Sequence, residues 1–388
     1  MKRRDRLAAG IVAATAVLAA ACGASPNATA GSDFANVSID PDALKPASIV
    51  NKGPFGETAT PAGQLVLTDA ECDEAKKHGY KVALSHLTMD LTWSKLVVQG
   101  IEDTLNKCGA SLISVSDSAW SADKQIAGLQ NLIQLRPDAI IGIPVDKNAT
   151  AQAFAAVPKA GIKLIFMHEA AAGMKPGVDY ATVSGPDDQG NGAAAAAMLA
   201  AYIPQGGKIG AEFYNADFFS TNGRKTGFLD WMRNNRPDIE VKEFSFTDPA
   251  QASNVAANFL TANPDVNGMY AIWDAPAMSL IAEMRAQGIK VPVATQDLGD
   301  EDALEIAKAD GYIIGTGAQA PYQQGEAHAS ATLRALLGQT LEPFYGIEAL
   351  PVAAPNLLKS YKYVYQQDPP REIVEACKQN PKCDSSEV

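Results

Sequence analysis

Carboxylate, amide and indole side chains recur directly after the strands that this sequence predicts. The set comprises Asp90, Trp93, Asp117, Trp120, Asp146, His168, Asn222, Trp273 and Asp297. Flat rings beside hydrogen-bonding groups suit a polyhydroxylated ligand, because C–H faces pack on rings while carboxylates and amides satisfy hydroxyls. Any one Asp could instead cap the helix that follows it. The joint occurrence with Trp93, Trp120 and Trp273 favours ligand binding.

The histidines and one glycine-containing segment give weaker evidence for a function. His168 could donate one hydrogen bond to a ligand and accept another, or it could simply bond backbone in its own loop. The four His are scattered and no Cys-x-x-Cys occurs, so we expect no metal. Gly315, Gly317 and Ala320 fit a dinucleotide-binding pattern, but Pro321 follows at once. A chain crossover fits this place better, and we expect no cofactor.

Alternating strands and helices must position these residues. The expected strands are 81–85, 111–115, 139–143, 163–167, 208–214, 241–245, 268–273 and 291–296. The expected helices are 93–107, 123–135, 150–159, 192–202, 223–234, 250–263 and 277–287. This alternation predicts βαβ units in two doubly wound parallel-sheet halves, of class α/β, with a pause at 180–184. Ligands of such sheets bind beyond the carboxyl ends of the strands, so the cleft between the halves is the expected site.

The N-terminal residues predict export. Four basic residues within Lys2–Arg6 precede an apolar run over 7–21 that ends in small residues before Cys22. The run is short for a membrane span and has the order of a signal peptide. Cys22 is therefore expected to be the lipidated first residue of the mature chain; ordinary secretion with cleavage nearby is the alternative. Residues 22–64 are rich in small and polar types and predict a flexible tether.

The formal charge limits the classes of ligand and partner that we expect. Removing Lys2, Arg3, Arg4, Arg6 and Asp5 takes the formal charge from −12 to −15. No basic cluster remains, so we expect no nucleic-acid partner and disfavour an anionic ligand.

Four cysteines remain beyond Cys22, an even number that permits three pairings in an oxidising compartment. We favour Cys72–Cys108, which flanks one strand–helix unit, and Cys377–Cys383, which brackets a short loop. Free buried thiols are the alternative, disfavoured for an exported chain.

Residues from about 80 to 345 resemble type I periplasmic binding proteins, especially the ribose-binding branch of sugar ABC-transporter receptors. The segments that carry the resemblance are 132–140 (LIQLRPDAI), 223–228 (GRKTGF), 263–266 (NPDV) and 318–322 (AQAPY). The resemblance implies two lobes joined by three crossovers, near 184–187, 318–321 and 345–347. We therefore expect a signal peptide at 1–21, an N-terminal lobe of 65–184 plus 320–345, a C-terminal lobe of 185–319 plus 346–376, and a tail at 377–388.

The family's sugar contacts fall on particular residues of this sequence. They are Asp90, Trp93, Asp146, Asn222, Asp297 and, at the hinge, Gln319. The chain departs from the ribose-binding pattern where Trp93 replaces paired Phe, Asn222 replaces Arg and Trp273 replaces Asn. These changes remove a cation and add a flat wall, which disfavours ribose itself.

The sequence as a whole predicts a monomeric, lipid-anchored substrate-binding protein of an ABC importer, without a catalytic step. The expected ligand is a small neutral sugar or sugar alcohol of the pentose, tetritol or pentitol class, and the expected partner is the permease. A sugar-sensing receptor coupled to a membrane kinase is one alternative. An exported sugar-modifying enzyme that uses His168, Glu169 or paired carboxylates is another.

Overall fold

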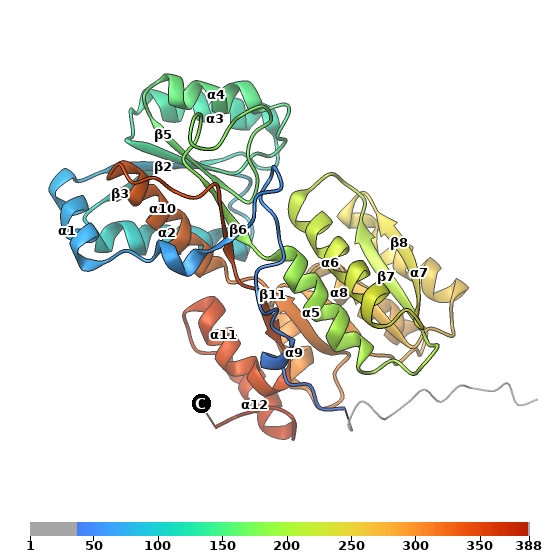
Figure 1. Ribbon diagram of the computed structural model, residues 1–388. Helices are drawn as coiled ribbons and strands as arrows, with labels where there is room; N and C mark the ends of the chain where they lie inside the picture. The colour runs from blue at the N-terminus through green and yellow to red at the C-terminus, as the bar shows by residue number, and fades with distance from the viewer. Residues whose placement is uncertain (1–36, 387–388) are drawn as a thin grey trace, which may run out of the picture.

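The computed structural model describes residues 37–386, which fold into two α/β lobes (Figure 1). The N-terminal lobe consists of β1 (Thr60–Pro61), a 3-10 turn (Ala62–Leu65), α1 (Asp69–His78), β2 (Lys81–His86), α2 (Thr92–Lys107), β3 (Ser111–Asp117), α3 (Ala122–Gln134), β4 (Ala139–Gly142), α4 (Ala151–Lys159), β5 (Lys163–Met167), β6 (Val183–Pro186), α10 (Pro321–Leu336) and β12 (Phe344–Ile347). The C-terminal lobe consists of α5 (Asp188–Ala200), β7 (Lys208–Tyr214), α6 (Phe219–Asn235), β8 (Glu240–Phe246), α7 (Ala252–Ala262), β9 (Gly268–Ala271), α8 (Asp274–Ala286), β10 (Val293–Gln296), α9 (Asp300–Ala307), β11 (Ile313–Ala318), β13 (Leu350–Val352), α11 (Leu357–Tyr365) and α12 (Arg371–Gln379).

Each lobe is built on one sheet with helices on both faces. The N-terminal sheet has the order β1-β12-β6-β5-β4-β2-β3, and the C-terminal sheet has the order β13-β11-β10-β9-β7-β8. Every described pair of neighbouring strands is parallel except β11 with β13. Separate apolar clusters cover the two faces of each sheet, which is why the strands read as continuous hydrophobic runs. The predicted α/β class with two parallel-sheet lobes is confirmed.

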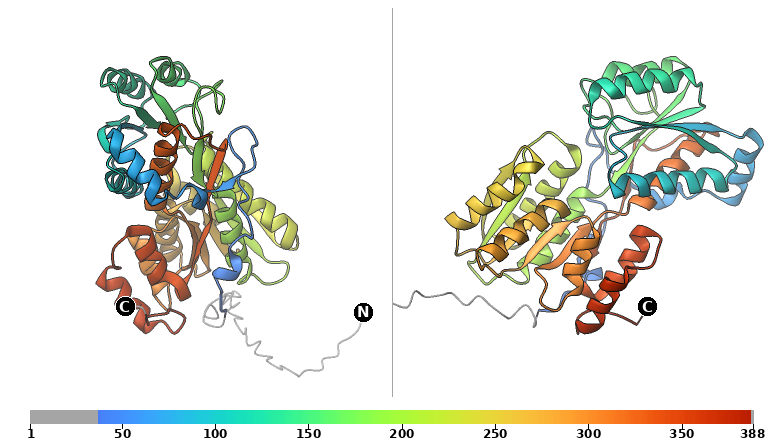
Figure 2. Two further views of the ribbon diagram at one scale, coloured as in Figure 1. Left: turned by 60° about the vertical axis from the view of Figure 1, so that its left-hand side comes forward. Right: turned by 180° about the vertical axis from the view of Figure 1, so that it is seen from behind.

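The chain passes between the two sheets three times. It leaves β6 for α5 at Asp187, returns from β11 to α10 at Gln319, and passes from β12 to β13 across Glu348 and Ala349. Figure 2 shows these segments between the lobes when the molecule is seen from behind. Both ends of each hinge segment are therefore held in a sheet or a helix, which leaves few residues to absorb any rotation of the lobes.

Residues 37–64 pack on the folded body, so the predicted flexible tether is wrong for this part of the chain. Ile39 is buried against α5 and Ala353 of the C-terminal lobe, while β1 pairs with β12 of the N-terminal lobe. Between them, the backbone N–H groups of Val50 and Asn51 donate to the buried Asp187 carboxylate, at 2.9 and 2.8 Å. Figure 1 shows this arm in blue along the hinge. Small polar residues predicted a tether, but long-range backbone pairing fixes the arm.

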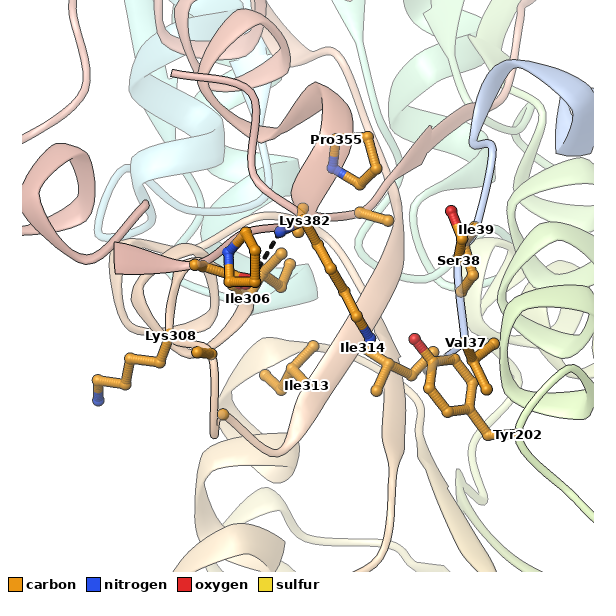
Figure 3. Close-up of a pocket in the computed structure, with 16 residues that line it drawn as sticks. Val37, Ser38, Ile39, Tyr202, Ile306, Lys308, Ile313, Ile314, Pro355 and Lys382 are labelled. Atoms are coloured by element: carbon orange, nitrogen blue, oxygen red, sulfur yellow. Dashed lines mark hydrogen bonds between the residues drawn. The ribbon is translucent and has the colours of Figure 1, made fainter. Parts of the chain in front are cut away.

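The C-terminal residues also join the C-terminal lobe instead of forming a separate tail. Cys377 lies in α12 and is buried in the core that α9 and α11 share. Disulfides join Cys72 to Cys108 and Cys377 to Cys383, the pairs that the sequence favoured. The second disulfide holds Lys382 near Tyr202, with the Lys382 ammonium 5.8 Å from the ring centre (Figure 3).

A cavity of about 280 Å³ lies at this pole, where the arm meets the C-terminal residues (Figure 3). Its lining includes Val37, Ile39, Ile313 and Lys382. Across residues 37–386 no helix is both long enough and apolar enough to cross a bilayer. The leader and Cys22 lie outside the described residues.

Candidate functional site

Two strand ends in the two lobes hold a polar residue in the same unusual backbone conformation. His168 directly follows β5 and has φ 61°, and Asp297 directly follows β10 and has φ 67°. Trp120, three residues beyond Asp117 at the end of β3, has φ 59°. Non-glycine residues avoid this left-handed region, and such strain concentrates where function requires a particular side-chain direction.

The side chains between the lobes form one hydrogen-bonded group. We call Trp93, His168, Asp188, Arg224, Asp297 and Gln319 the inter-lobe site. The Trp93 indole N–H donates to Gln319 Oε1 at 2.9 Å, and Gln319 Nε2 donates to Asp188 Oδ1 at 3.0 Å. The His168 ring stands edge-on to Trp93, with 5.3 Å between ring centres. The site thus joins the first N-terminal loop, the hinge and the start of α5.

Arg224 and Asp297 form the ion pair of the site. Arg224 Nη1 and Nη2 donate to the two carboxylate oxygens of Asp297 at 2.9 and 2.8 Å. Arg224 Nε donates more weakly to Asp188 at 3.4 Å, and Nη1 also donates to the Ile272 carbonyl at 3.2 Å. The Arg224 side chain is only 6% exposed, whereas that of Asp297 is 29% exposed. Asp297 therefore neutralises a buried cation and keeps acceptor surface free for a ligand.

Burial raises the pKa of the other carboxyl groups near this pair. Burial raises the pKa of Asp188 to about 7, although Arg224 opposes the shift. Burial and the charge of Asp297 raise the pKa of Asp274 to about 6. Burial also raises the pKa of Asp302 well above its ordinary value. Arg224 is thus the cation of the site near pH 7, and the buried carboxyl groups around it keep their protons to higher pH than exposed carboxyl groups do.

A second set of contacts crosses between the lobes at the edge of the site. Lys147 of the N-terminal lobe pairs with Asp217 of the C-terminal lobe at 3.2 Å and lies 3.9 Å from Glu169. Burial raises the pKa of Glu169 to about 7, against the effect of Lys147. Trp120 stands edge-on to Phe218, with ring centres 6.3 Å apart. The loop between β7 and α6 is thus the part of the C-terminal lobe that meets these N-terminal loops.

The three tryptophans expected in the site lie in different surroundings. Trp93 is half-buried within the inter-lobe site, and Trp120 is 52% exposed at its edge. Trp273 precedes α8 and packs edge-on against Tyr214 and Phe246 of its own lobe, at 5.5 and 5.3 Å between ring centres. It adjoins Asp274, whose carboxyl senses the charge of Asp297.

Four of the expected polar residues are not brought into this hydrogen-bonded group. Asp117 accepts from the Ala119 N–H, and Asp146 accepts from the backbone N–H groups of Asn148 and Ala149. These backbone hydrogen bonds lower the pKa of Asp146. Both carboxylates therefore hold their own loops, and neither caps the following helix, because Ser121 and Thr150 occupy those N-cap positions.

The other two expected polar residues outside the hydrogen-bonded group are Asp90 and Asn222. Asp90 is exposed before α2, and Asn222 is exposed on α6, where its amide donates to Asp217 at 3.3 Å. Asn222 supplies no cation at this position, but Arg224 places a guanidinium elsewhere in the site.

Sequence reasoning missed Arg224 and Asp188 as members of the site, and it missed Ser220 and Gln324, which contact His168. Arg224 was visible in the segment 223–228, but its partner Asp297 lies 73 residues away. Asp188 follows the acidic Asp187, which caps α5 by accepting from the Gly190 N–H, and the pair resembles an ordinary helix start.

A larger groove of about 890 Å³ lies elsewhere between the lobes, beside α2, α10 and α11, and none of the ten expected ligand residues lines it.

The comparisons with known proteins agree with this architecture. Residues 82–340 match a periplasmic binding protein domain. The ribose import binding protein RbsB of Bacillus subtilis is 26% identical over 271 residues, which cover 70% of this chain and 86% of that protein. An ABC transporter solute binding protein from Agrobacterium vitis with bound D-fucose has a TM-score of 0.64 and 23% identity, covering 73% of this chain and 99% of its own. A second one from the same species, with bound allitol, has a TM-score of 0.64 and 18% identity, covering 73% and 98%.

At these identities the two solved structures show the shared fold. The domain match extends over most of the folded body, and the curated relative extends over a similar share. The chain belongs to the periplasmic binding protein family, in the ribose-binding-like branch of its type I members.

Proposed function

We propose that this protein binds a small neutral sugar or sugar alcohol between its lobes and delivers it to an ABC permease. The observation that carries the proposal is the Arg224–Asp297 pair, whose cation is buried and whose carboxylate keeps 29% of its side chain exposed. Half-buried Trp93 of the N-terminal lobe is linked to Arg224 through Gln319 and Asp188. Half-buried Trp273 of the C-terminal lobe follows Ile272, whose carbonyl accepts from Arg224. A carboxylate that accepts from hydroxyl groups beside indole rings is suited to a polyol.

The charge balance favours an uncharged ligand. Arg224 is already paired with Asp297, and the remaining carboxyl groups near it have raised pKa values. A phosphate or carboxylate ligand would have to compete with Asp297 for the guanidinium and would lie close to Asp188 and Asp274. The neighbours from Agrobacterium vitis hold D-fucose and allitol, a sugar and a linear polyol. We propose the same range of ligands here, with pentoses, tetritols and pentitols favoured.

A panel titration tests the ligand class. Isothermal calorimetry and thermal shift should be run with D-arabinose, D-ribose, D-fucose, erythritol and allitol, with ribose 5-phosphate and gluconate as charged controls. A ligand at a hundred times its Kd should stabilise the protein by about 2.7 kcal/mol. Binding of one neutral compound without the charged controls supports the proposal. Preference for a charged compound, or no response to the panel, contradicts it.

We further propose that the protein works as a monomer on the outer face of the cell membrane, attached through a lipid on Cys22. The support is the basic and apolar leader that ends at this cysteine. Fractionation of cells that express wild type or Cys22→Ser tests the anchor, with Cys383→Ser as a cysteine control. Release of only the Cys22 variant into the soluble fraction is expected. A Cys22→Ser protein that stays with the membrane contradicts lipid anchoring at this residue.

A further inference from the structure

His168 connects the two lobes through both of its ring nitrogens. Nδ1 lies 3.0 Å from the Ser220 hydroxyl of α6, in the C-terminal lobe, and Nε2 lies 3.1 Å from Gln324 Oε1 of α10, in the N-terminal lobe. Both His168 and Gln324 are buried, and Ser220 is 5% exposed. A buried imidazole with two partners has a defined tautomer, and here that tautomer can be derived from the groups around it.

The derivation begins at two groups whose hydrogen-bonding roles are fixed by their chemistry. The Trp93 indole can only donate, so the Gln319 atom that it meets is the amide oxygen. Asp188 Oδ1 accepts from the Arg224 guanidinium and also meets the other end of Gln319, which must be the amide nitrogen. The donor on one side and the acceptor on the other therefore fix the orientation of Gln319.

The orientation of Gln319 fixes the groups that follow. Gln324 contacts the Gln319 amide oxygen at 3.1 Å, so Gln324 must present its NH2 group there and its oxygen to His168. An oxygen acceptor at 3.1 Å requires a proton on His168 Nε2. In the neutral ring Nδ1 is then an acceptor, so the single hydrogen of the Ser220 hydroxyl must point to it and not to the nearby Asp188 carboxyl. Burial, together with the charge of Arg224 and the neighbouring His86, lowers the pKa of His168 to about 4, so the ring is neutral near pH 7.

We propose that His168 is a positioning residue that couples contact between the lobes to the orientation of the ligand-facing groups Trp93 and Gln319. Ser220 reaches Nδ1 only when α6 lies against the N-terminal lobe, and it then donates to the nitrogen that the Nε2–H tautomer leaves without a proton. That tautomer holds Gln324, which in turn holds Gln319 and Trp93. The inference deepens the proposed sugar-binding function and rests on it for its binding measurement alone.

Long-range proton–nitrogen NMR of the four histidine rings tests the tautomer without any ligand. Spectra are taken at pH 7, and the His168 signals are assigned by their loss in His168→Gln. The wild-type ring should carry its proton on Nε2 and none on Nδ1. Gln324→Met removes the group that fixes the ring, so a mixture of tautomers is expected. Ser220→Ala should shift the Nδ1 resonance, because that nitrogen loses its donor, whereas Ser279→Ala on α8 should not.

A Nδ1–H tautomer or a charged ring in the wild type at pH 7 overturns the inference, whatever the ligand is. So does a single unchanged tautomer in Gln324→Met, because the ring would then be fixed by something else.

Dissociation kinetics test the coupling between the lobes. The probe is D-fucose or allitol, whichever the wild type binds, followed by stopped-flow. Ser220→Ala and Gln324→Met should each accelerate dissociation about five-fold or more, and Ser279→Ala should leave it unchanged. The double variant should be little faster than either single variant, because both act through the same ring. Effects that multiply would show that the two residues act independently and would overturn the proposal.

The two kinds of failure are separable. If no neutral compound of the panel binds, the proposed ligand class fails, while the NMR spectra still decide the tautomer. If a probe binds and the spectra show the opposite tautomer, the inference about His168 fails and sugar binding stands.

Discussion

Removal of the Asp297 carboxylate should weaken both ligand binding and folding, because this one group serves the ligand and Arg224 together. Its two oxygens accept the bidentate hydrogen bonds of a guanidinium that is 6% exposed. Breaking a buried ion pair by removing one partner costs about 3–5 kcal/mol. The partial exposure of Asp297 and the remaining contact of Arg224 with Asp188 reduce this cost, so we expect about 2–3 kcal/mol for Asp297→Ala. Loss of a charged acceptor should weaken sugar binding by roughly 10–100-fold.

Urea denaturation and calorimetry on a small set of variants separate these effects. Asp297→Asn keeps one acceptor oxygen and should lose less stability than Asp297→Ala. Arg224→Met combined with Asp297→Ala leaves no buried cation and should be at least as stable as the single Asp297→Ala variant. Asp230→Ala is the control, because it breaks an exposed pair with Arg233 and should change stability by at most about 0.5 kcal/mol. Wild-type stability in Asp297→Ala, or additive losses in the double variant, would refute the role assigned to this pair.

Three further sets of variants test the buried carboxyl of β7, the disulfides and the N-terminal arm. Burial without a hydrogen-bond partner raises the pKa of Glu212 to about 8, so stability should fall as pH rises from about 4.5 through 8, by on the order of 5 kcal/mol. Glu212→Gln should remove this loss in urea midpoints measured from pH 5 to 9, and an unchanged pH profile would contradict the assignment. Loss of Cys72–Cys108, which closes the longer loop, should cost about 4 kcal/mol against about 2 kcal/mol for Cys377–Cys383. Equal losses on denaturation would count against the loop-length argument. Ile39→Asp should lower the free energy of unfolding by about 2–3 kcal/mol, because it places a carboxylate in the buried contact between the arm and the C-terminal lobe. Val50→Thr changes an exposed position and should leave stability unchanged. Equal melting temperatures for the two variants would show that Ile39 does not hold the arm.

Short stretches of sequence predicted most of the strands and helices, because the spacing of buried side chains depends on the local backbone conformation. Continuous apolar strands and amphipathic helices such as α2 and α3 follow from their burial periodicity. Helix starts were less predictable: α5 begins at Asp188 and α6 at Phe219, each four residues before the expected start. The reason at α5 is that Asp187 caps the helix directly after the hinge, so no loop separates β6 from it.

The candidate site was only partly predictable. Strand-end position brought Trp93, His168 and Asp297 to the meeting of the lobes, as the rule for parallel sheets implies. The same rule does not distinguish them from Asp117 and Asp146, whose carboxylates accept from backbone in their own loops. That distinction depends on backbone geometry within a few residues, which residue type alone does not specify.

The sequence by itself determined the alternation of strands and helices, the excess of negative charge and the set of residues available at the strand ends. The tertiary structure decided which of those residues meet. Arg224 finds Asp297 because β10 lies next to β9 in the sheet that α6 flanks, and residues 50 and 51 find Asp187 because the arm follows the hinge. Hydrogen bonds and ion pairs act over a few ångströms, so partners that are far apart in sequence are selected only by the packing that brings them together.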